Sequence, residues 1–136
     1  MSVVSEGEVS IENEGDIVVA RRTVREIGAQ VGFSPTDITR IVTAASELAR
    51  NIFQYAGKGA MQWRSLDKPD QLGLELRFVD SGPGIANLNL ALQSGFSTGA
   101  GLGMGLPGAK RLMDEMEIQS SPGQGTSIIV RKWRKM

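Results

Sequence analysis

The chain of 136 residues is predicted to be an α+β protein, a two-layer sandwich in which helices cover one face of a mixed, mostly antiparallel sheet. Two observations predict this fold class. Segments with helical periodicity gather in the first half of the chain and strand hairpins in the second, which is the order of an α+β domain. The length is near the commonest size of one domain, and no repeat or linker divides it, so we expect a single domain over residues 1–136.

Two helices are expected in the first half, after a short edge strand over residues 3–11. Apolar residues recur every three to four positions over residues 16–31, and Gly32 follows in the usual place for a helix end. Ser34 then offers an N-cap and is followed by a proline for the first turn. The apolar stripe of this second helix extends to about Tyr55.

The sequence of the second half of the chain predicts two hairpins, separated by a glycine-rich segment and a short helix. In the strand over residues 72–80, Leu, Leu, Leu and Phe alternate with Gly, Glu and Arg, which predicts one buried face and one wet face. Residues 81–105 hold seven glycines, and a gap of this length is usually functional. The remaining expected elements are a strand over 60–66, a turn over 67–70, a helix over 106–113, a strand over 115–120, a turn over 122–125 and a strand over 126–132.

Composition excludes several classes of protein. The 15 basic and 15 acidic residues give zero net charge, which argues against nucleic-acid binding because phosphate contacts need a surplus of Lys and Arg on one face. The basic run at residues 131–135 is interpreted as a solvated strand end. The chain has no cysteine and no histidine, which excludes disulfides, thiolate metal sites and phosphohistidine chemistry.

The N-terminus is acidic and lacks the basic and apolar regions of a signal peptide. No apolar run approaches the roughly 18 residues that a membrane-spanning helix needs. We therefore expect a soluble, cytoplasmic protein without a membrane partner.

An acid–amide pair lies on the second expected helix. Glu47 and Asn51 are four residues apart, so they lie on one face of the helix, one turn apart, at the rim of its apolar stripe. A carboxylate can take a proton from a hydroxyl, and an amide oxygen is a suitable ligand for Mg²⁺. The alternative is a surface glutamate with a helix-capping asparagine.

Asp80 ends an expected strand and is followed by Ser-Gly-Pro-Gly. An acid in this place can accept a hydrogen bond from an exocyclic amine such as the 6-amino group of adenine, and glycines beside it let the backbone approach a flat base. The alternative is an ordinary strand-ending turn. Thr126 begins the last expected strand, where its hydroxyl can reach a base edge or an ordered water or can be an ordinary strand threonine.

A glycine run precedes the third expected helix. Its GMGLPG phrase formally matches the dinucleotide fingerprint GxGxxG, but no strand precedes it, and the chain contains no P-loop phrase GxxxxGK[ST]. A glycine loop leading into a helix N-terminus can still hold phosphates through its N–H groups, with Ser97 and Thr98 as further donors. The alternative is a flexible linker.

In this order, ExxxN on a helix, DxGxG after a strand, GxGLGxGL before a helix and a late Gly-Thr resemble the N, G1 and G2 boxes of the GHKL (Bergerat-fold) ATPases. Within that family, the phrases ELARNI, YAGKG, GLGMGLPGAKRLMDE and GTSIIVRKW resemble the serine/threonine switch kinases of bacterial stress signalling complexes, the stressosomes. The resemblance covers about residues 10–134.

The resemblance implies a role for each matching residue. Glu47 would be the general base, Asn51 the Mg²⁺ ligand, and Asp80 the adenine ligand, with Thr126 supporting the adenine site. Gly82 and Gly84 would shape the adenine pocket. The segment from Gly99 to Gly105, with Gly101, Leu102, Gly103 and Met104, would be the ATP lid and phosphate cradle, and Ser97 and Thr98 lie just ahead of it as candidate phosphate donors.

The same resemblance implies an ATP- and Mg²⁺-dependent protein serine/threonine kinase. Its substrate would be a STAS-domain antagonist that sequesters the kinase, and the released kinase would bind and activate a PP2C-type phosphatase. The alternative is an anti-sigma factor of the same fold that holds a sigma subunit. An ATP-binding adaptor without turnover is disfavoured because Glu47 is present.

Overall fold

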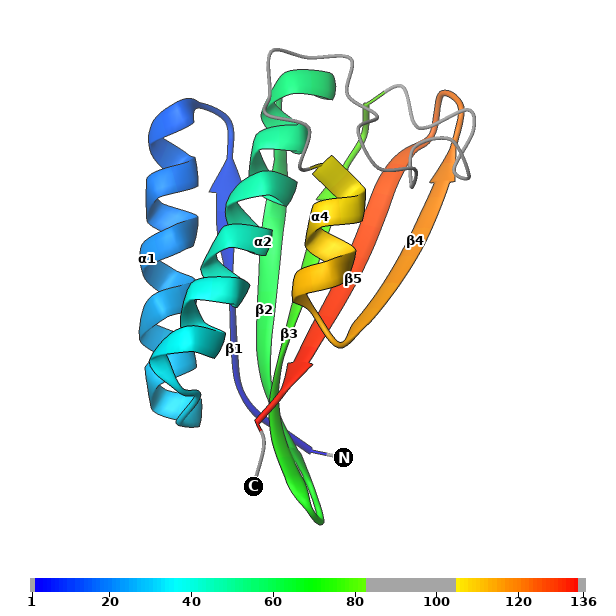
Figure 1. Ribbon diagram of the computed structural model, residues 1–136. Helices are drawn as coiled ribbons and strands as arrows, with labels where there is room; N and C mark the ends of the chain where they lie inside the picture. The colour runs from blue at the N-terminus through cyan, green and yellow to red at the C-terminus, as the bar shows by residue number, and fades with distance from the viewer. Residues whose placement is uncertain (1, 83–104, 135–136) are drawn as a thin grey trace.

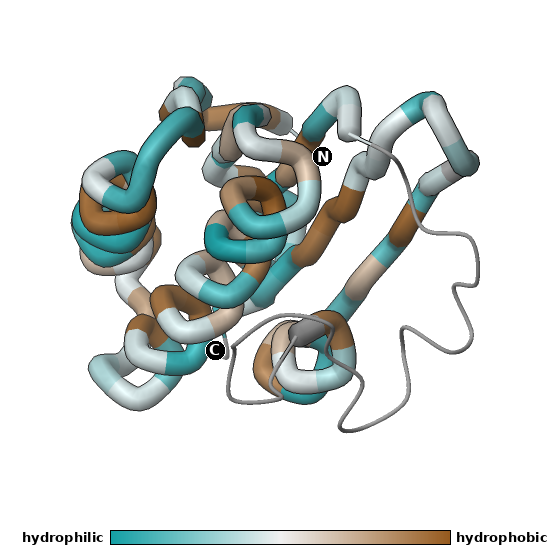
Figure 2. The backbone as a smooth tube through the Cα atoms, turned by 90° about the horizontal axis from the view of Figure 1, so that it is seen from above, coloured by the Kyte–Doolittle hydropathy of each residue, from teal (hydrophilic) through white to brown (hydrophobic). Residues whose placement is uncertain are grey.

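Three helices cover one face of a five-stranded sheet in the computed structural model, which describes residues 2–82 and 105–134 (Figure 1). The two layers are also separate when the molecule is seen from above (Figure 2). In chain order the elements are β1 (Ser2–Ile11), α1 (Glu14–Val31), α2 (Pro35–Tyr55), β2 (Gly59–Lys68), β3 (Gln71–Asp80), α4 (Gly105–Leu112), β4 (Glu115–Ser121) and β5 (Gly125–Trp133).

The strands follow the order β1-β2-β3-β5-β4, and each of the four pairings between described strands is antiparallel. The α+β sandwich with helices on one face is therefore confirmed, and the described part of the sheet is more uniform than the mixed sheet expected. The edge strand expected at the N-terminus is also confirmed, because β1 pairs only with β2 in the described sheet.

Local capping signals fix the ends of the two long helices. Asn13 accepts a hydrogen bond from the backbone N–H of Asp16, and the Asp16 side chain accepts one from the Asn13 backbone. This capping box starts α1 two residues earlier than its apolar periodicity indicates. Gly32 ends α1 in the left-handed region with φ 96°, and Ser34 caps α2 by accepting from the N–H of Asp37 at 3.1 Å. Both of these predicted boundaries are confirmed.

The core lies between the helical layer and the sheet face beneath it. α2 runs along the middle of this layer between α1 and α4 (Figure 1). Its apolar stripe supplies much of the core, because side chains three and four positions apart share the face that meets the sheet. The largest fully buried side chains are Ile11, Val24, Ile41, Leu48, Met61, Leu66, Leu74, Leu76, Phe78 and Val130.

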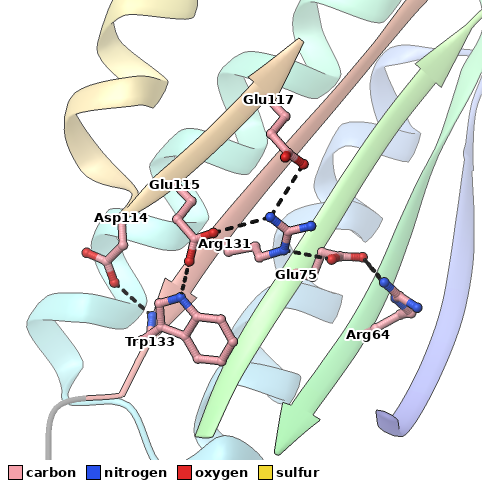
Figure 3. A network of polar contacts seen from close by, with 7 residues as sticks. All are labelled: Arg64, Glu75, Asp114, Glu115, Glu117, Arg131 and Trp133. Carbon is pink, nitrogen blue, oxygen red and sulfur yellow. Dashed lines mark hydrogen bonds and ion pairs between the residues drawn. The ribbon is translucent and has the colours of Figure 1, made fainter. Parts of the chain in front are cut away.

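The opposite face of the sheet differs from the wet surface that strand alternation predicts. Pairing register places Glu6, Arg64, Glu75, Arg131 and Glu115 in one row across the five strands, with alternating charge. Glu75 is only 3% exposed and is held by Arg64 at 2.7 Å and Arg131 at 2.8 Å (Figure 3). Flanking arginine stems exclude water from the central carboxylate, so the prediction of a uniformly wet face is wrong at Glu75.

The C-terminal basic run is also not the solvated strand end expected. Lys132 and Trp133 are buried. The ammonium of Lys132 donates to the carbonyl of Leu112 at 2.9 Å and lies 3.5 Å from the Asp114 carboxylate. The backbone N–H of Trp133 donates to Asp114 at 2.8 Å (Figure 3). The run thus fastens β5 to the end of α4, and Lys135 lies outside the described residues.

No helix within residues 2–82 and 105–134 combines the length and the apolar character that crossing a membrane requires.

Candidate functional site

Glu47 and Asn51 lie on the side of α2 that faces away from α1. Ile38 marks the side toward α1, because a Cβ added at Gly28 of that helix would lie 3.3 Å from the Ile38 Cγ1. Nine residues later, at about 100° per residue, the helix has turned to its opposite side at Glu47. Since α2 lies between α1 and α4 (Figure 1), the acid–amide pair faces the α4 side.

The two side chains of this pair have different surroundings. The Glu47 side chain is 19% exposed, and one of its oxygens accepts a hydrogen bond from Arg50 Nη1 at 3.0 Å. The Asn51 side chain is partly buried and makes no hydrogen bond to another described residue. Within residues 2–82 and 105–134, a cation therefore orients the carboxylate, and nothing holds the amide.

Asp80 is the last residue of β3, directly opposite Gly59 on β2 and Thr126 on β5. Residues directly opposite one another in antiparallel strands point to the same face. That face is the one covered by helices, because Phe78, two positions earlier on β3, is 1% exposed and belongs to the core. The structure therefore brings Asp80 and Thr126 together at one end of the sheet.

Three glycines allow the backbone to close around Asp80. A Cβ at Gly125, which has φ 88°, would lie 2.1 Å from the Asp80 carbonyl oxygen, and one at Gly59 would lie 3.1 Å from the Asp80 Cβ. A Cβ at Gly82 would lie 2.6 Å from the Ala56 Cβ, at the end of α2, and 3.1 Å from the Asp80 Oδ1. We call Gly59, Gly82 and Gly125 the glycine cradle. It keeps the end of α2 and the ends of three strands closer than any side chain would permit.

The cradle leaves part of the Asp80 carboxylate available. Its Oδ1 accepts a hydrogen bond from the backbone N–H of Gly82 at 2.9 Å, which fixes the orientation of the group. Its Oδ2 accepts no hydrogen bond from another described residue. A carboxylate oriented in this way can accept a hydrogen bond from the amino group of a flat base through its second oxygen.

The Thr126 side chain is hydrogen-bonded to the neighbouring edge strand, β4. Its hydroxyl lies 2.8 Å from the Ser120 hydroxyl, which also donates to the Gly125 carbonyl at 3.2 Å. Ser120 was not predicted as a site residue. Only the pairing of Ser120 with Thr126 in the sheet shows its place, and no local motif marks it.

The glycine loop falls mostly outside the described residues. This holds for the predicted ligands Gly84, Ser97, Thr98, Gly99, Gly101, Leu102, Gly103 and Met104. Gly105 is described and begins α4. The N-terminal end of α4 points to the same end of the molecule as the end of β3 (Figure 1), so its first-turn N–H groups are directed toward the end that carries Asp80.

The described residues contain no group of three or more acidic side chains that could hold a metal ion. A cation such as Mg²⁺ would take one oxygen from Asn51 and the others from phosphates and water, as Mg²⁺ commonly does with nucleotides. The available donors therefore fit a metal that arrives with a nucleotide.

An acid in a glycine cradle, an acid–amide pair on a helix of the layer above and a helix N-terminus at the same end of the molecule are the features of this α+β domain that can be compared with known proteins. The chain belongs to the family described as histidine kinase-like ATPase domain, whose model matches residues 10–132. This match and the relatives below confirm the GHKL resemblance.

Two curated relatives cover most of the chain. The serine/threonine-protein kinase RsbT of Bacillus subtilis (strain 168) is 47% identical over 125 residues, which is 92% of this chain and 94% of the relative. An anti-sigma F factor of Caldanaerobacter subterraneus subsp. tengcongensis is 32% identical over 120 residues, 84% of this chain and 82% of the relative. The first relationship agrees with the predicted enzyme class, a serine/threonine-protein kinase.

Two solved structures share the fold. The RsbU and RsbW domains of Rv1364c from Mycobacterium tuberculosis superpose with a TM-score of 0.67 at 19% identity, covering 97% of this chain and 34% of that one. The mycobacterial sensor histidine kinase MprB superposes with a TM-score of 0.55 at 19% identity, covering 97% of this chain and 100% of that one. At this identity they confirm the fold alone.

Proposed function

We propose that this chain is a single-domain, ATP- and Mg²⁺-dependent protein serine/threonine kinase. The arrangement that supports the proposal has two parts: Glu47 and Asn51 lie on the α4 side of α2, and the cradled Asp80 lies at the end of the molecule where α2 finishes and α4 begins. The 47% identical serine/threonine-protein kinase supports the same activity.

Each residue has a defined task in this proposal. Asp80 accepts a hydrogen bond from the adenine amino group through its Oδ2, and the glycine cradle holds the strand ends that position this carboxylate. Asn51 would hold Mg²⁺, which when bound neutralises phosphate charge during phosphoryl transfer. Glu47 accepts the proton of a serine or threonine hydroxyl as that oxygen forms its bond to the γ-phosphorus and the bond to ADP breaks.

Arg50 orients Glu47 for this task. The 3.0 Å contact holds one carboxylate oxygen and leaves the other available to the acceptor hydroxyl. The glutamate is thus positioned before substrate arrives, which avoids a reorganisation cost during the reaction.

We propose a STAS-domain antagonist as the phosphate acceptor and a PP2C-type phosphatase as the protein that the released kinase activates, both in the cytoplasm. The motif resemblance of residues 10–134 motivates these partners. A second function, sequestration of a sigma subunit, is favoured by the 32% identity to anti-sigma F factors.

The test is incubation with radiolabelled ATP and a STAS-domain protein from the same organism, followed by mapping of the phosphorylated residue. We expect label on one serine or threonine with the wild-type chain and none with Glu47→Gln. Absence of transfer by folded wild type, together with capture of an RNA polymerase sigma subunit from the native cell, would replace the kinase proposal by the anti-sigma function.

A further inference from the structure

Lys132 on β5 holds the C-terminal end of α4. It lies directly opposite Leu74 on β3, so its side chain leaves the sheet on the face that the helices cover. The side chain is only 7% exposed, and its ammonium donates to the carbonyl of Leu112, the last residue of α4, at 2.9 Å. The same ammonium lies 3.5 Å from the Asp114 carboxylate. A buried ammonium is costly unless it is paired, and both described partners of this one lie at the end of α4 or just after it.

Asp114 extends this connection along β5. Its backbone N–H donates to the Arg131 carbonyl at 3.0 Å, and its carboxylate accepts from the backbone N–H of Trp133 at 2.8 Å (Figure 3). Three consecutive residues of β5 are therefore hydrogen-bonded to the end of α4 or to the residues after it. β5 is paired on both sides, with β3 and β4, so it is a fixed reference within the sheet. We call Lys132 and Asp114 the α4 clamp.

α4 depends on such contacts because it is weak by itself. It has eight residues, two of them glycine, whereas helices shorter than about 12–15 residues are marginal in water and glycine disfavours a helix. Leu106 and Ala109 pack into the core, with Met113 just beyond the helix. Apolar attraction is non-directional, so the directional hydrogen bonds of the clamp determine where the helix ends on the sheet.

The helix that the clamp holds lies beside the acid–amide pair. α4 packs against α2 (Figure 1), and Glu47 and Asn51 are on the α4 side of α2. A displacement of α4 therefore changes the surroundings of both side chains. Asp80, by contrast, is held by β3 and the glycine cradle, and its carboxylate accepts from the backbone N–H of Gly82. None of these described contacts of Asp80 comes from α4.

We propose that Lys132 is a positioning residue for phosphoryl transfer, which acts through α4 on the part of the site around Glu47 and Asn51. The clamp keeps α4 in a fixed position beside the pair, so the proton acceptor and the Mg²⁺ ligand are preorganised before the nucleotide arrives. This inference rests on the proposed kinase function. The alternative is a clamp that serves stability alone, and the two roles predict different results for ATP and for adenosine.

The first experiment measures the hold on α4 without nucleotide. Amide hydrogen exchange would be followed in wild type and in Lys132→Met, whose side chain is similar in length but lacks the ammonium. We expect exchange within residues 105–112 to become about tenfold faster, with exchange in α1 unchanged. Unchanged exchange in α4, or an equal rise in α1, would overturn the role of Lys132 in holding this helix.

The second experiment separates positioning from stability. Calorimetry would compare a non-hydrolysable ATP analogue with Mg²⁺ against adenosine, well below the unfolding temperature of each variant. In Lys132→Met we expect the analogue to bind about tenfold more weakly and adenosine to stay within about twofold of wild type, because Asp80 keeps its place. Equal losses for both ligands, or no loss for either, would overturn the positioning role and leave the clamp with stability alone.

The matched control is Lys68→Met, the same substitution at a lysine whose ammonium lies 4.0 Å from the centroid of the Trp133 ring. That ring covers Gly73 on the sheet face away from α4, so the ratio of the two affinities should stay within about twofold of wild type. An equal change of this ratio in Lys68→Met and Lys132→Met would contradict the proposal.

Asp114→Asn is a milder second variant of the clamp. Its amide oxygen can still accept from the Trp133 N–H, but the charge beside Lys132 is lost, so the ATP analogue should bind about threefold more weakly. Wild-type affinity in folded Asp114→Asn would exclude the ion pair from the positioning role. Failure of wild type to bind either ligand would instead contradict the proposed function, while hydrogen exchange still decides whether Lys132 holds α4.

Discussion

Glu75 on β3 and Arg131 on β5 form an ion pair of 2.8 Å on the sheet face opposite the three described helices. Arg64 on β2 holds the other oxygen of the same carboxylate at 2.7 Å. Burial by itself raises the pKa of Glu75, but the hydrogen bonds and charges of the two arginines outweigh it and leave that pKa below its usual value. Burial lowers the pKa of Arg131, but the hydrogen bond to Glu75 and the charges of Glu75, Glu117 and Glu115 outweigh it and leave that pKa above its usual value. The ionised pair is therefore a property of the folded state.

This ion pair predicts a pH-dependent contribution to stability. Because folding lowers the pKa of Glu75, the contribution is fully present above the carboxyl pKa of the unfolded chain, about 4.3, and is lost as pH falls through the lower folded value. Glu75→Gln should lower the free energy of unfolding by about 1–3 kcal/mol at pH 7. This range is below that of a fully buried ion pair because solvent screens the partly exposed arginines. This difference should shrink toward zero in acid.

Urea unfolding of wild type and Glu75→Gln between pH 7 and pH 3 measures the effect. Glu26→Gln, at an exposed position without an ion pair among the described residues, is the matched control and should change stability little. A constant difference between wild type and Glu75→Gln across this range would show that the charge of Glu75 is not what stabilises the sheet.

Local signals allowed the helices to be predicted, whereas cross-strand neighbours escaped prediction. The end of α1 at Gly32 and the start of α2 at Ser34 depend on residues adjacent in sequence, so both could be read directly. The burial of Glu75 and Lys132 depends on which strands pair and in what register. Alternation within one strand carries no information about an arginine on the next.

In the candidate site, too, local motifs could be recognised in the sequence, whereas contacts between distant strands could not. The motif spacing identified Glu47, Asn51, Asp80 and Thr126, and the structure places Asp80 opposite Thr126. The contact between Gly125 and Asp80 escaped prediction, since it depends on strand ends that are 45 residues apart in the chain and meet only in the sheet.

Gly125 and Gly123 provide a test of the glycine cradle. Both have positive φ, 88° and 78°, but an added Cβ meets the Asp80 backbone only at Gly125 and has open space at Gly123. Gly123→Ala should therefore cost about 1 kcal/mol of backbone strain, and Gly125→Ala should cost more because strand ends must move. Thermal unfolding compares the two variants. Equal losses would mean that the close approach to Asp80 is tolerated without movement.

Asp80→Asn should weaken ATP binding more than it slows phosphotransfer. The amide oxygen can still accept from the Gly82 N–H, but its amino group then takes the place of the free oxygen and meets the adenine amine donor to donor. Such a mismatch should cost about 1–3 kcal/mol of binding free energy. Calorimetry with a non-hydrolysable ATP analogue is the measurement, and Asp70→Asn in the exposed turn is the control. Unchanged affinity in folded Asp80→Asn would remove this residue from the adenine site.

Glu47→Gln should separate catalysis from the proposed activation of a PP2C-type phosphatase. Glutamine keeps the size of the side chain and can still accept from Arg50, but it cannot take the proton of the acceptor hydroxyl. Phosphotransfer should therefore fall by about 10²–10⁴-fold, with ATP binding retained. The Glu47 side chain is only 19% exposed, so the surface offered to a phosphatase should change little, and the variant should still stimulate the PP2C-type enzyme.

Both activities can be measured on the same preparation, with labelled phosphate transfer for the kinase and phosphatase turnover against added protein for the activation. Gln54→Glu, at an exposed position about two turns nearer the end of α2, controls for substitution on this helix and should leave phosphotransfer within about twofold. Transfer by Glu47→Gln within threefold of wild type would exclude Glu47 as the base. Loss of phosphatase stimulation in folded Glu47→Gln at saturating concentration would mean that activation requires catalysis, because the partner surface itself would be intact.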